Sequence, residues 1–385
     1  MHSSIMAKIF IPKQTHPGET RVAATPETVK HMVGAGLEVV VEAGAGLGSH
    51  ISDAQYEAAG ATVNADRKAA LGEADAVVDV IAPAPEEVDS LREGALLVAL
   101  LSPHQNLELV GRLAERKISS IAMELVPRIT RAQEMDVLSS QASIAGYKAV
   151  LLAAYRLGKY FPLLMTAAGT IKPARVVIMG AGVAGLQAIA TAKRLGAIVE
   201  VSDIREAVKL EIESLGGKFI PLPETEERGE GEGGYAREMS EDFLRRQREI
   251  VAEHIAAADV VICTALVPGK KAPVLVTREM VEGMRAGAVV VDLAAVQGGN
   301  CELSKAGEEV MRNDVLILGP TNLPAETPAD ASQLFARNVW ALIKTQLKEG
   351  ALSLDLEDEV VDGALLTHQG EVRHAPTKEA LKGGA

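Results

Sequence analysis

The stretch of residues 175–205, RVVIMGAGVAGLQAIATAKRLGAIVEVSDIR, constrains the fold of this chain more than any other. It places an apolar run, a glycine-rich turn, an amphipathic run and a second apolar run in that order. Parallel strands cannot be joined by a tight turn and are usually connected through a helix. The stretch therefore predicts a parallel β-α-β unit with a sharp turn between its first strand and its helix.

The turn indicates a bound dinucleotide. Gly180, Gly182 and Gly185 form G-x-G-x-x-G. The first glycine permits the tight turn, the second lets a pyrophosphate approach the backbone, and the third lets helix and strand pack closely. Asp203 ends the second strand, where a carboxylate accepts hydrogen bonds from the adenosine ribose. A 2′-phosphate would be repelled there, so NAD is favoured over NADP, and Arg205 is the one neighbour that softens this preference. A purely structural tight turn is the alternative interpretation.

Apolar strands alternate with amphipathic helices along most of the 385 residues. This pattern predicts an α/β protein with two Rossmann-like, doubly wound parallel-sheet domains, separated by a cleft and joined by long helices. A helical stretch at 136–161 leads into the second domain, and a helix at 331–350 returns the chain to the first. The N-terminal domain is therefore expected to comprise residues 1–135 plus 330–385, and the NAD(H)-binding domain residues 136–329.

Charge and composition exclude several classes of function. The net charge is −13 and no basic patch stands out, which argues against nucleic acid and against direct contact with an anionic membrane surface. No apolar run reaches the roughly 18 residues of a membrane helix, so direct membrane insertion is not expected. Cys263 and Cys301 lack metal-ligand spacing, and we interpret them as reduced core residues of a cytoplasmic protein without a metal site.

Two further segments attract attention. The acidic, glycine-rich residues 224–242 cannot bury themselves and form either a plain mobile loop or a lid beside a site. Residues 128–141 carry many polar side chains, among which Gln133, Asp136 and Ser139 are three apart and would share one face of a helix. A carboxamide ring needs such donors and acceptors, so we expect this segment to line the cleft. A capped helix with a solvated polar face is the other interpretation.

Two blocks carry a resemblance to a known family: RITRAQEMDVLSSQASIAGYKAV and, after it, TAAGTIKPARVVIMGAGVAGLQAIATAKRLGA. They resemble the NAD(H)-binding component, the soluble alpha subunit, of proton-translocating NAD(P) transhydrogenase, within the alanine dehydrogenase/transhydrogenase superfamily. The similarity runs from Ala7 to near Gly350. It implies Si-specific hydride transfer between NAD(H) bound here and NADP(H) bound on a partner subunit, coupled to proton translocation by a membrane-embedded subunit. It also implies a homodimer, held on the cytoplasmic side of the inner membrane through its partner subunits.

The resemblance also implies roles for individual residues. One group would surround the nicotinamide and its ribose, and Gln133 within it would reach toward the partner's nicotinamide. This group consists of Arg128, Ile129, Thr130, Arg131, Gln133, Asp136 and Ser139. A second group would line the pyrophosphate turn and the adenosine, together with a mobile loop and two further nucleotide contacts. It consists of Gly180, Gly182, Val183, Ala184, Gly185, Asp203, Ile204, Arg205, Gly234, Tyr235, Gln247 and Leu266.

Alanine dehydrogenases share this fold, and HPGETRVAATP resembles them, with Arg21 as a possible carboxylate ligand. However, Ile81 stands where they carry a substrate lysine, VALLSP lacks their histidine, and Val296 replaces their aspartate before Gln-Gly-Gly. The acid–base groups that amino-acid oxidation needs are absent at these positions. Hydride transfer between two nicotinamides needs only positioning. An NAD(H)-binding module without a redox role is a third possibility.

Overall fold

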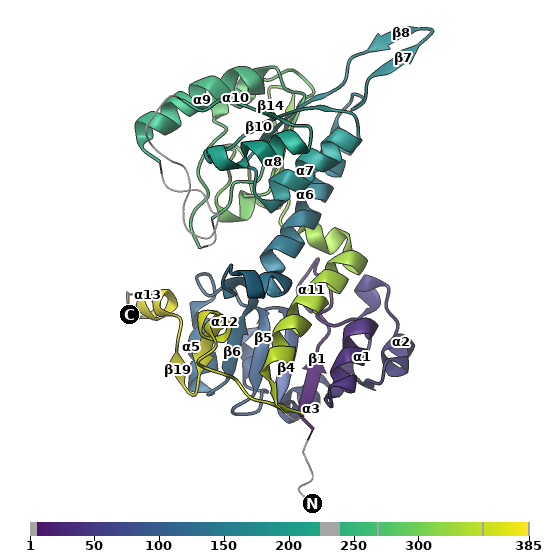
Figure 1. Cartoon of the computed structure of the whole chain (residues 1–385), viewed down its shortest axis with the longest axis vertical. Coiled ribbons are helices and arrows are strands. Elements are labelled where there is room, and N and C mark those ends of the chain that lie inside the picture. Colours follow the sequence, from purple (N-terminus) through teal and green to yellow (C-terminus); the bar gives the residue numbers. More distant parts are fainter. Residues whose placement is uncertain (1–5, 224–238, 268, 349, 384–385) are drawn as a thin grey trace, which may run out of the picture. The chain divides into compact units, whose positions relative to one another are not determined.

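The computed structural model describes residues 6–223, 239–267, 269–348 and 350–383. The chain forms two compact units. Unit 1 comprises Met1–Gln141 and Ala325–Ala385, and unit 2 comprises Ala142–Pro324. The division between the units falls a few residues from the boundaries expected from the sequence. Figure 1 shows the elements of both units coloured along the chain.

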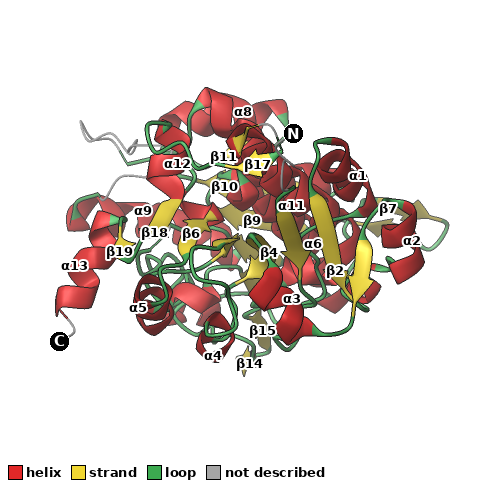
Figure 2. Ribbon diagram, turned by 90° about the horizontal axis from the view of Figure 1, so that it is seen from below, coloured by secondary structure: helices red, strands yellow, loops and turns green. Residues whose placement is uncertain are grey.

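Unit 1 is built on an eight-stranded sheet in the order β19-β18-β6-β5-β4-β1-β2-β3. The strands from β1 to β6 are parallel, β18 pairs antiparallel with β6, and β19 pairs antiparallel with β18 at the edge. Strand β1 pairs with both β2 and β4, and Figure 2 labels these two neighbours. The strand bounds are β1 Lys8–Ile11, β2 Glu38–Glu42, β3 Thr62–Asn64, β4 Ala76–Ile81, β5 Leu96–Leu100, β6 Ser119–Ala122, β18 Leu365–His368 and β19 Glu371–Val372.

Helices bury an apolar core on each face of this sheet. The returning helix α11 (Pro328–Ile343) buries Phe335, Val339 and Leu342 at 0% exposure, and their spacing of four and three residues places them on one apolar face. A short strand pair, β16 (Leu347–Lys348) and β17 (Ala351–Leu352), follows it. The helix bounds are α1 Pro26–Gly34, α2 Asp53–Ala58, α3 Arg67–Glu73, α4 Pro85–Val88, α5 Leu107–Glu115, α11 Pro328–Ile343, α12 Glu359–Ala364 and α13 Ala375–Gly383.

Unit 2 is built on a seven-stranded sheet in the order β11-β10-β9-β12-β13-β15-β14. All neighbours are parallel except β14 with β15. The strand order reverses between β9 and β12, and ligands of such sheets bind outside the carboxyl ends of the strands at that point. The bounds are β9 Arg175–Met179, β10 Ile198–Ser202, β11 Lys218–Phe219, β12 Val260–Cys263, β13 Val289–Asp292, β14 Glu309–Arg312, β15 Val315–Leu318, α7 Val183–Arg194, α8 Lys209–Ser214, α9 Glu241–Ala256 and α10 Arg278–Glu282.

The long helix α6 spans Val137–Arg156, so it ends earlier than the expected residue 161. By length and composition alone it is the one helix in the described part of the chain that could cross a membrane, which the sequence analysis did not anticipate. One such helix is weak evidence for a span, and Ala149, Val150 and Ala153 of α6 are buried in the core of unit 2.

A two-stranded hairpin follows α6 and was not predicted from the sequence. It consists of β7 (Leu164–Thr166) and β8 (Gly169–Ile171), and Figure 1 shows it extending away from the main sheet of unit 2. Its side chains Met165 and Ile171 are 78% and 40% exposed. The sequence TAAGTIKP therefore forms a separate arm rather than a connection packed on the sheet.

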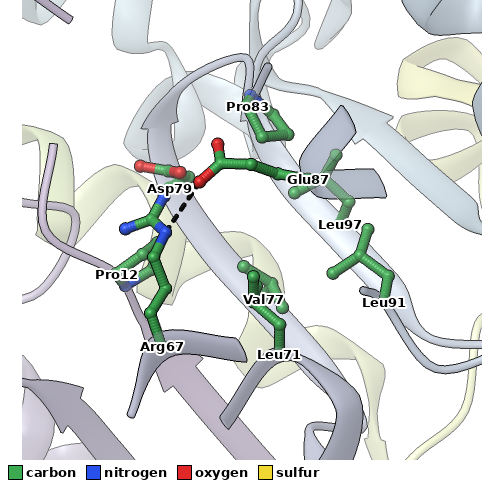
Figure 3. Close-up of a pocket in the computed structure, with 9 residues that line it drawn as sticks. All are labelled: Pro12, Arg67, Leu71, Val77, Asp79, Pro83, Glu87, Leu91 and Leu97. Carbon is green, nitrogen blue, oxygen red and sulfur yellow. Dashed lines mark hydrogen bonds and ion pairs between the residues drawn. The ribbon is translucent and has the colours of Figure 1, made fainter. Parts of the chain in front are cut away.

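A buried carboxyl group lies beside the carboxyl end of β4 in unit 1. Asp79 is 4% exposed and accepts hydrogen bonds from the backbone N–H of Val80 and the side-chain amide of Gln14. It borders a cavity of about 10 Å³, together with the ion pair between Arg67 and Glu87 (Figure 3). Such a cavity holds at most a water molecule. Burial raises the pKa of Asp79 to about 7, because the charged form loses its hydration.

We predict that the free energy of unfolding depends less on pH in Asp79→Asn than in the unmodified chain. The pKa of Asp79 is higher in the folded chain, about 7, than the ordinary 3.8, so its ionisation lowers the free energy of unfolding as pH rises between these values. The loss is a few kcal/mol, since each pH unit in this window is worth about 1.4 kcal/mol. Denaturant unfolding at pH 5 and pH 8 measures it. The exposed Glu86→Gln is the control, and equal pH dependence of Asp79→Asn and the unmodified chain would contradict the prediction.

Candidate functional site

The glycine turn joins β9 to α7, and two of its glycines are required by neighbouring protein atoms. Gly180 has φ +102°, a left-handed conformation that favours glycine, and a Cβ there would lie 2.8 Å from the hydroxyl of Thr264. A Cβ on Gly185 would lie 1.9 Å from the carbonyl oxygen of Gly180. Glycine at these positions therefore lets α7 start directly against the end of β9.

Gly182 differs, because among the described residues no atom other than those of its two chain neighbours lies within 4 Å of the position its Cβ would take. Its φ of −74° is also accessible to any residue. The open space therefore fits a group that comes from outside the chain, as the close approach of a pyrophosphate requires. Gly182 is the N-cap of α7 and supplies no capping side chain, so the first N–H groups of this 12-residue helix suit an anion.

Asp203 lies beside this turn, as the spacing predicted, and is 6% exposed. One carboxylate oxygen accepts from the backbone N–H of Ala181 at 2.7 Å and pairs with the Arg205 guanidinium at 2.7 Å. The other accepts from the backbone N–H and Nε of Arg205 at 2.8 and 2.9 Å. The carboxylate thus fixes both the turn and Arg205, and Ile204 between them is half-buried. A ribose hydroxyl would donate to the Asp203 carboxylate, which its hydrogen bonds to Ala181 and Arg205 already hold in one orientation.

The remaining predicted residues of unit 2 occupy different surroundings. Val183 is 38% exposed at the start of α7, and Ala184 is half-buried. Gln247 on α9 is only 5% exposed, and its side-chain amide donates to the hydroxyl of Ser202 at 3.2 Å. It therefore supports the residue before Asp203. Leu266 follows β12 and is half-buried. Gly234 and Tyr235 lie outside the described residues.

The polar segment before α6 belongs to unit 1 and contains a break. Residues Thr130–Met135 form a 3-10 helix, and α6 begins only at Val137. The sequence suggested that Gln133, Asp136 and Ser139 share one face of a single helix. This prediction was wrong, because Gln133 lies in the 3-10 helix and Ser139 in α6. The reason is that Asp136 caps α6, because its carboxylate accepts from the backbone N–H and the hydroxyl of Ser139 at 2.8 and 2.6 Å.

Three of the seven predicted nicotinamide residues, Arg128, Asp136 and Ser139, meet at this cap. The Nε of Arg128 lies 4.0 Å from the carboxylate of Asp136. Thr130 and Gln133 expose their side chains, whereas Ile129 packs against the core of unit 1. Arg131 differs, because its guanidinium pairs with Asp358 at 2.6 Å and with Glu359 of α12. Its first role is to hold the C-terminal part of unit 1.

The residues that matched alanine dehydrogenases do not form an acid–base set. Arg21 is 5% exposed and pairs with Glu19 at 2.7 Å, and it donates to the side-chain carbonyl of Gln141 at 2.8 Å. Its guanidinium is thus occupied by the protein. Ile81 and Val296, two of the three positions at which alanine dehydrogenases carry acid–base groups, offer no proton donor or acceptor.

Both cysteines are free and buried. Burial raises the pKa of the Cys263 thiol well above its ordinary value and that of Cys301 to about 11. They behave as apolar core residues, since the thiolate is the reactive form. No group of three or more potential metal ligands occurs among the residues described.

Sequence reasoning missed two residues that shape the turn. Gly146 lies in α6, and a Cβ there would come within 2.1 Å of the carbonyl oxygen of Ala184, so its small size lets α6 reach the start of α7. Thr264 follows β12, and its hydroxyl donates to the carbonyl oxygen of Gly180 at 2.9 Å. A glycine in the middle of an apolar helix was the available signal for the first. Nothing in the local sequence indicates the second.

The strand, turn, helix and carboxylate of unit 2 define a dinucleotide-binding protein of the Rossmann class. Comparisons with known proteins narrow this class. The family models "Alanine dehydrogenase/PNT, N-terminal domain" and "Alanine dehydrogenase/PNT, C-terminal domain" match residues 10–145 and 149–375. The chain therefore belongs to the alanine dehydrogenase/PNT family.

Individual relatives come from both branches of this family. The chain is 49% identical to an NAD(P) transhydrogenase subunit alpha protein of Rhodospirillum rubrum, over 95% of this chain and 98% of the relative. The crystal structure of a transhydrogenase from Sinorhizobium meliloti matches with a TM-score of 0.86 at 46% identity, over 95% of this chain and 99% of the other. Alanine dehydrogenase of Bacillus subtilis is 30% identical over 95% and 92% of the two chains.

We predict that the unmodified chain binds NADH more tightly than NADPH and that Asp203→Asn narrows this difference. The amide keeps the shape of the carboxylate but loses the charge that repels a 2′-phosphate and that pairs with Arg205. NADH affinity should fall by about tenfold, because a charge-assisted hydrogen bond to the ribose is lost. Calorimetric titration with both nucleotides measures it, with the exposed Glu206→Gln as control. Equal affinities of the unmodified chain for NADH and NADPH would contradict the assigned role of Asp203.

Proposed function

We propose that this chain is the NAD(H)-binding alpha subunit of a proton-translocating NAD(P) transhydrogenase. In this proposal it holds NAD(H), and hydride passes directly to or from NADP(H) bound on a partner subunit. The observation that carries the proposal is a complete dinucleotide turn in a chain whose Arg21, Ile81 and Val296 offer no acid–base chemistry. The relatives named as transhydrogenase subunits, more similar than the alanine dehydrogenase, support the same choice.

Direct hydride transfer explains why positioning residues suffice. Oxidation of an amino acid or alcohol releases a proton, so its site needs a general base. Transfer between two nicotinamides moves a hydride alone, and the protein need only hold the rings at near-attack distance with water excluded. The proposal also includes Si-specific transfer and its coupling to proton translocation by a membrane subunit, both of which are implied by the family resemblance.

In this proposal, different groups of residues bind the two halves of the nucleotide. Asp203, Ile204 and Arg205 are assigned to the adenosine, and the 180–185 turn to the pyrophosphate. Arg128, Asp136 and Ser139 are assigned to the nicotinamide and its ribose, because the cap of α6 already orients their polar groups. Gln133 is exposed beside them and is assigned to the partner's nicotinamide. Gly234 and Tyr235 are assigned to a loop that closes over the nucleotide.

The proposal includes a homodimer and a partner in the membrane. The hairpin arm and the region before it expose Tyr155, Tyr160, Leu163 and Met165 at 86%, 58%, 53% and 78%. Exposed apolar side chains favour burial against another protein surface. We assign this surface to a second copy of the chain. The membrane-embedded subunit and the NADP(H)-binding domain would hold the dimer on the cytoplasmic side of the inner membrane.

We predict that the purified chain neither reduces NAD with L-alanine nor reduces pyruvate with NADH. The reason is that Ile81 and Val296 cannot exchange protons and Arg21 is paired with Glu19. Absorbance at the NADH band measures both directions, with an authentic alanine dehydrogenase as positive control. Turnover that depends on this chain would overturn the proposed function in favour of the dehydrogenase branch.

We also predict that Gln133→Ala slows hydride transfer to NADP(H) on the partner subunit much more than it weakens NADH binding. A neutral, exposed amide adds little to a nucleotide held by the turn and Asp203, whereas misplacing a reacting ring by about 1 Å can cost about a hundredfold in rate. Arg128→Ala should reduce affinity and rate together.

Stopped-flow transfer in the reconstituted complex, paired with calorimetry, measures both quantities. Glu134→Gln is the matched control, because Glu134 is the exposed neighbour of Gln133 and is paired only with Lys344 among the ion pairs described. Normal transfer by Gln133→Ala would remove that residue from the reaction. Absence of transfer by the unmodified chain, despite NADH binding, would favour an NAD(H)-binding module without a redox role.

A further inference from the structure

The segment Thr264–Leu266 follows β12 and lies at the reversal of strand order in unit 2. Because β12 pairs with β9, the segment lies across this reversal from the 180–185 turn. The backbone N–H of Thr264 donates to the carbonyl oxygen of Met179 at 2.8 Å, and its hydroxyl to that of Gly180 at 2.9 Å. The residues after Thr264 therefore leave the sheet directly beside the turn.

One buried side chain determines the path of this segment. Asn300 is 0% exposed, and its amide nitrogen donates to the carbonyl oxygens of Ala265 and Pro273, each at 2.9 Å. Its amide oxygen accepts from the backbone N–H of Ala265 at 3.0 Å. The carboxamide thus pairs with both polar groups of the Ala265 backbone, as a neighbouring strand would, and uses both of its N–H donors.

The turn that carries Asn300 is itself held in one conformation. Gly298 and Gly299 have φ +96° and +83°, and a Cβ on Gly299 would lie 2.3 Å from the hydroxyl of Ser304. The buried carboxylate of Asp292 accepts from the backbone N–H of Cys301 at 2.9 Å and from that hydroxyl at 2.6 Å. These contacts, together with the two glycines, leave the side chain of Asn300 little freedom to move.

We propose that Asn300 is a positioning residue for the nicotinamide half of bound NAD(H), and that it acts through the backbone of Ala265 and the adjacent Leu266. This inference rests on the proposed function. The adenosine half has its own supports in Asp203 and the 180–185 turn, none of which contacts the Asn300 side chain through the hydrogen bonds above. The QGGN sequence after β13 therefore serves the cofactor site without an acid–base group.

The test compares the affinity for NADH with the affinity for AMP, and so distinguishes an effect on the nicotinamide half from one on the adenosine half. Asn300→Asp keeps the shape but places an acceptor opposite the carbonyl oxygens of Ala265 and Pro273, so the pairing cannot form. We expect NADH affinity to fall by about tenfold or more, while AMP, which lacks the nicotinamide half, binds within about twofold of the unmodified chain. Single-turnover hydride transfer in the reconstituted complex should slow by about a hundredfold.

Two further variants keep the test decisive. Asn300→Ser removes the carboxamide without adding charge, and it decides the question with the same readouts if Asn300→Asp does not fold. Asn106→Asp is the control, because the Asn106 amide donates to the carbonyl oxygen of Leu101 at 2.8 Å in unit 1. This change should alter the melting temperature but neither nucleotide affinity.

Equal losses of NADH and AMP affinity at Asn300 would overturn the proposal, because they would show a general structural role. Unchanged NADH affinity and transfer rate in a folded variant would overturn it equally. The proposed function fails differently: the unmodified chain would then bind NADH and AMP but transfer no hydride, and the comparison of NADH with AMP would still test Asn300.

Discussion

The close packing of the start of α7 against the end of β9 is the constraint on which the rest of unit 2 depends. A side chain on Gly185 would collide with the carbonyl oxygen of Gly180, and one on Gly180 would collide with Thr264. Because neither position has a side chain, the helix N-terminus lies at the reversal of strand order, where an anion can reach its N–H groups. Asp203 then fixes the same turn through Ala181.

The chain thus combines an oriented nucleotide turn in unit 2 with hydrogen-bonded positioning residues in each of its two units. Asp136 caps α6 and holds Ser139, Asp203 holds Arg205, and Asn300 holds Ala265. Each of these side chains is committed to protein partners before a nucleotide binds. Preorganisation of this kind suits a reaction whose barrier depends on the placement of two rings rather than on proton transfer.

The fold class and the nucleotide turn were predictable because they depend on local patterns. Strand and helix periodicity gave the two α/β units, and the spacing of Gly180, Gly182 and Gly185 with Asp203 gave the turn. The break at Asp136 was not predictable, because polar residues three apart suit either one helix or a 3-10 helix that ends at a cap. The hairpin of β7 and β8 was missed because its short strands are exposed and lack an alternating apolar pattern.

The sequence by itself therefore determined the alternation of strands and helices in the two units, the place of the dinucleotide turn, and which acid–base residues are missing, since these follow from residue types a few positions apart. Only the tertiary structure decided which polar groups are already engaged. The Arg21 guanidinium donates to Gln141, Gln247 supports Ser202, and Asn300 supports Ala265, over sequence separations of 120, 45 and 35 residues. Such partners are set by strand order and packing, which bring distant residues together and which no local pattern encodes.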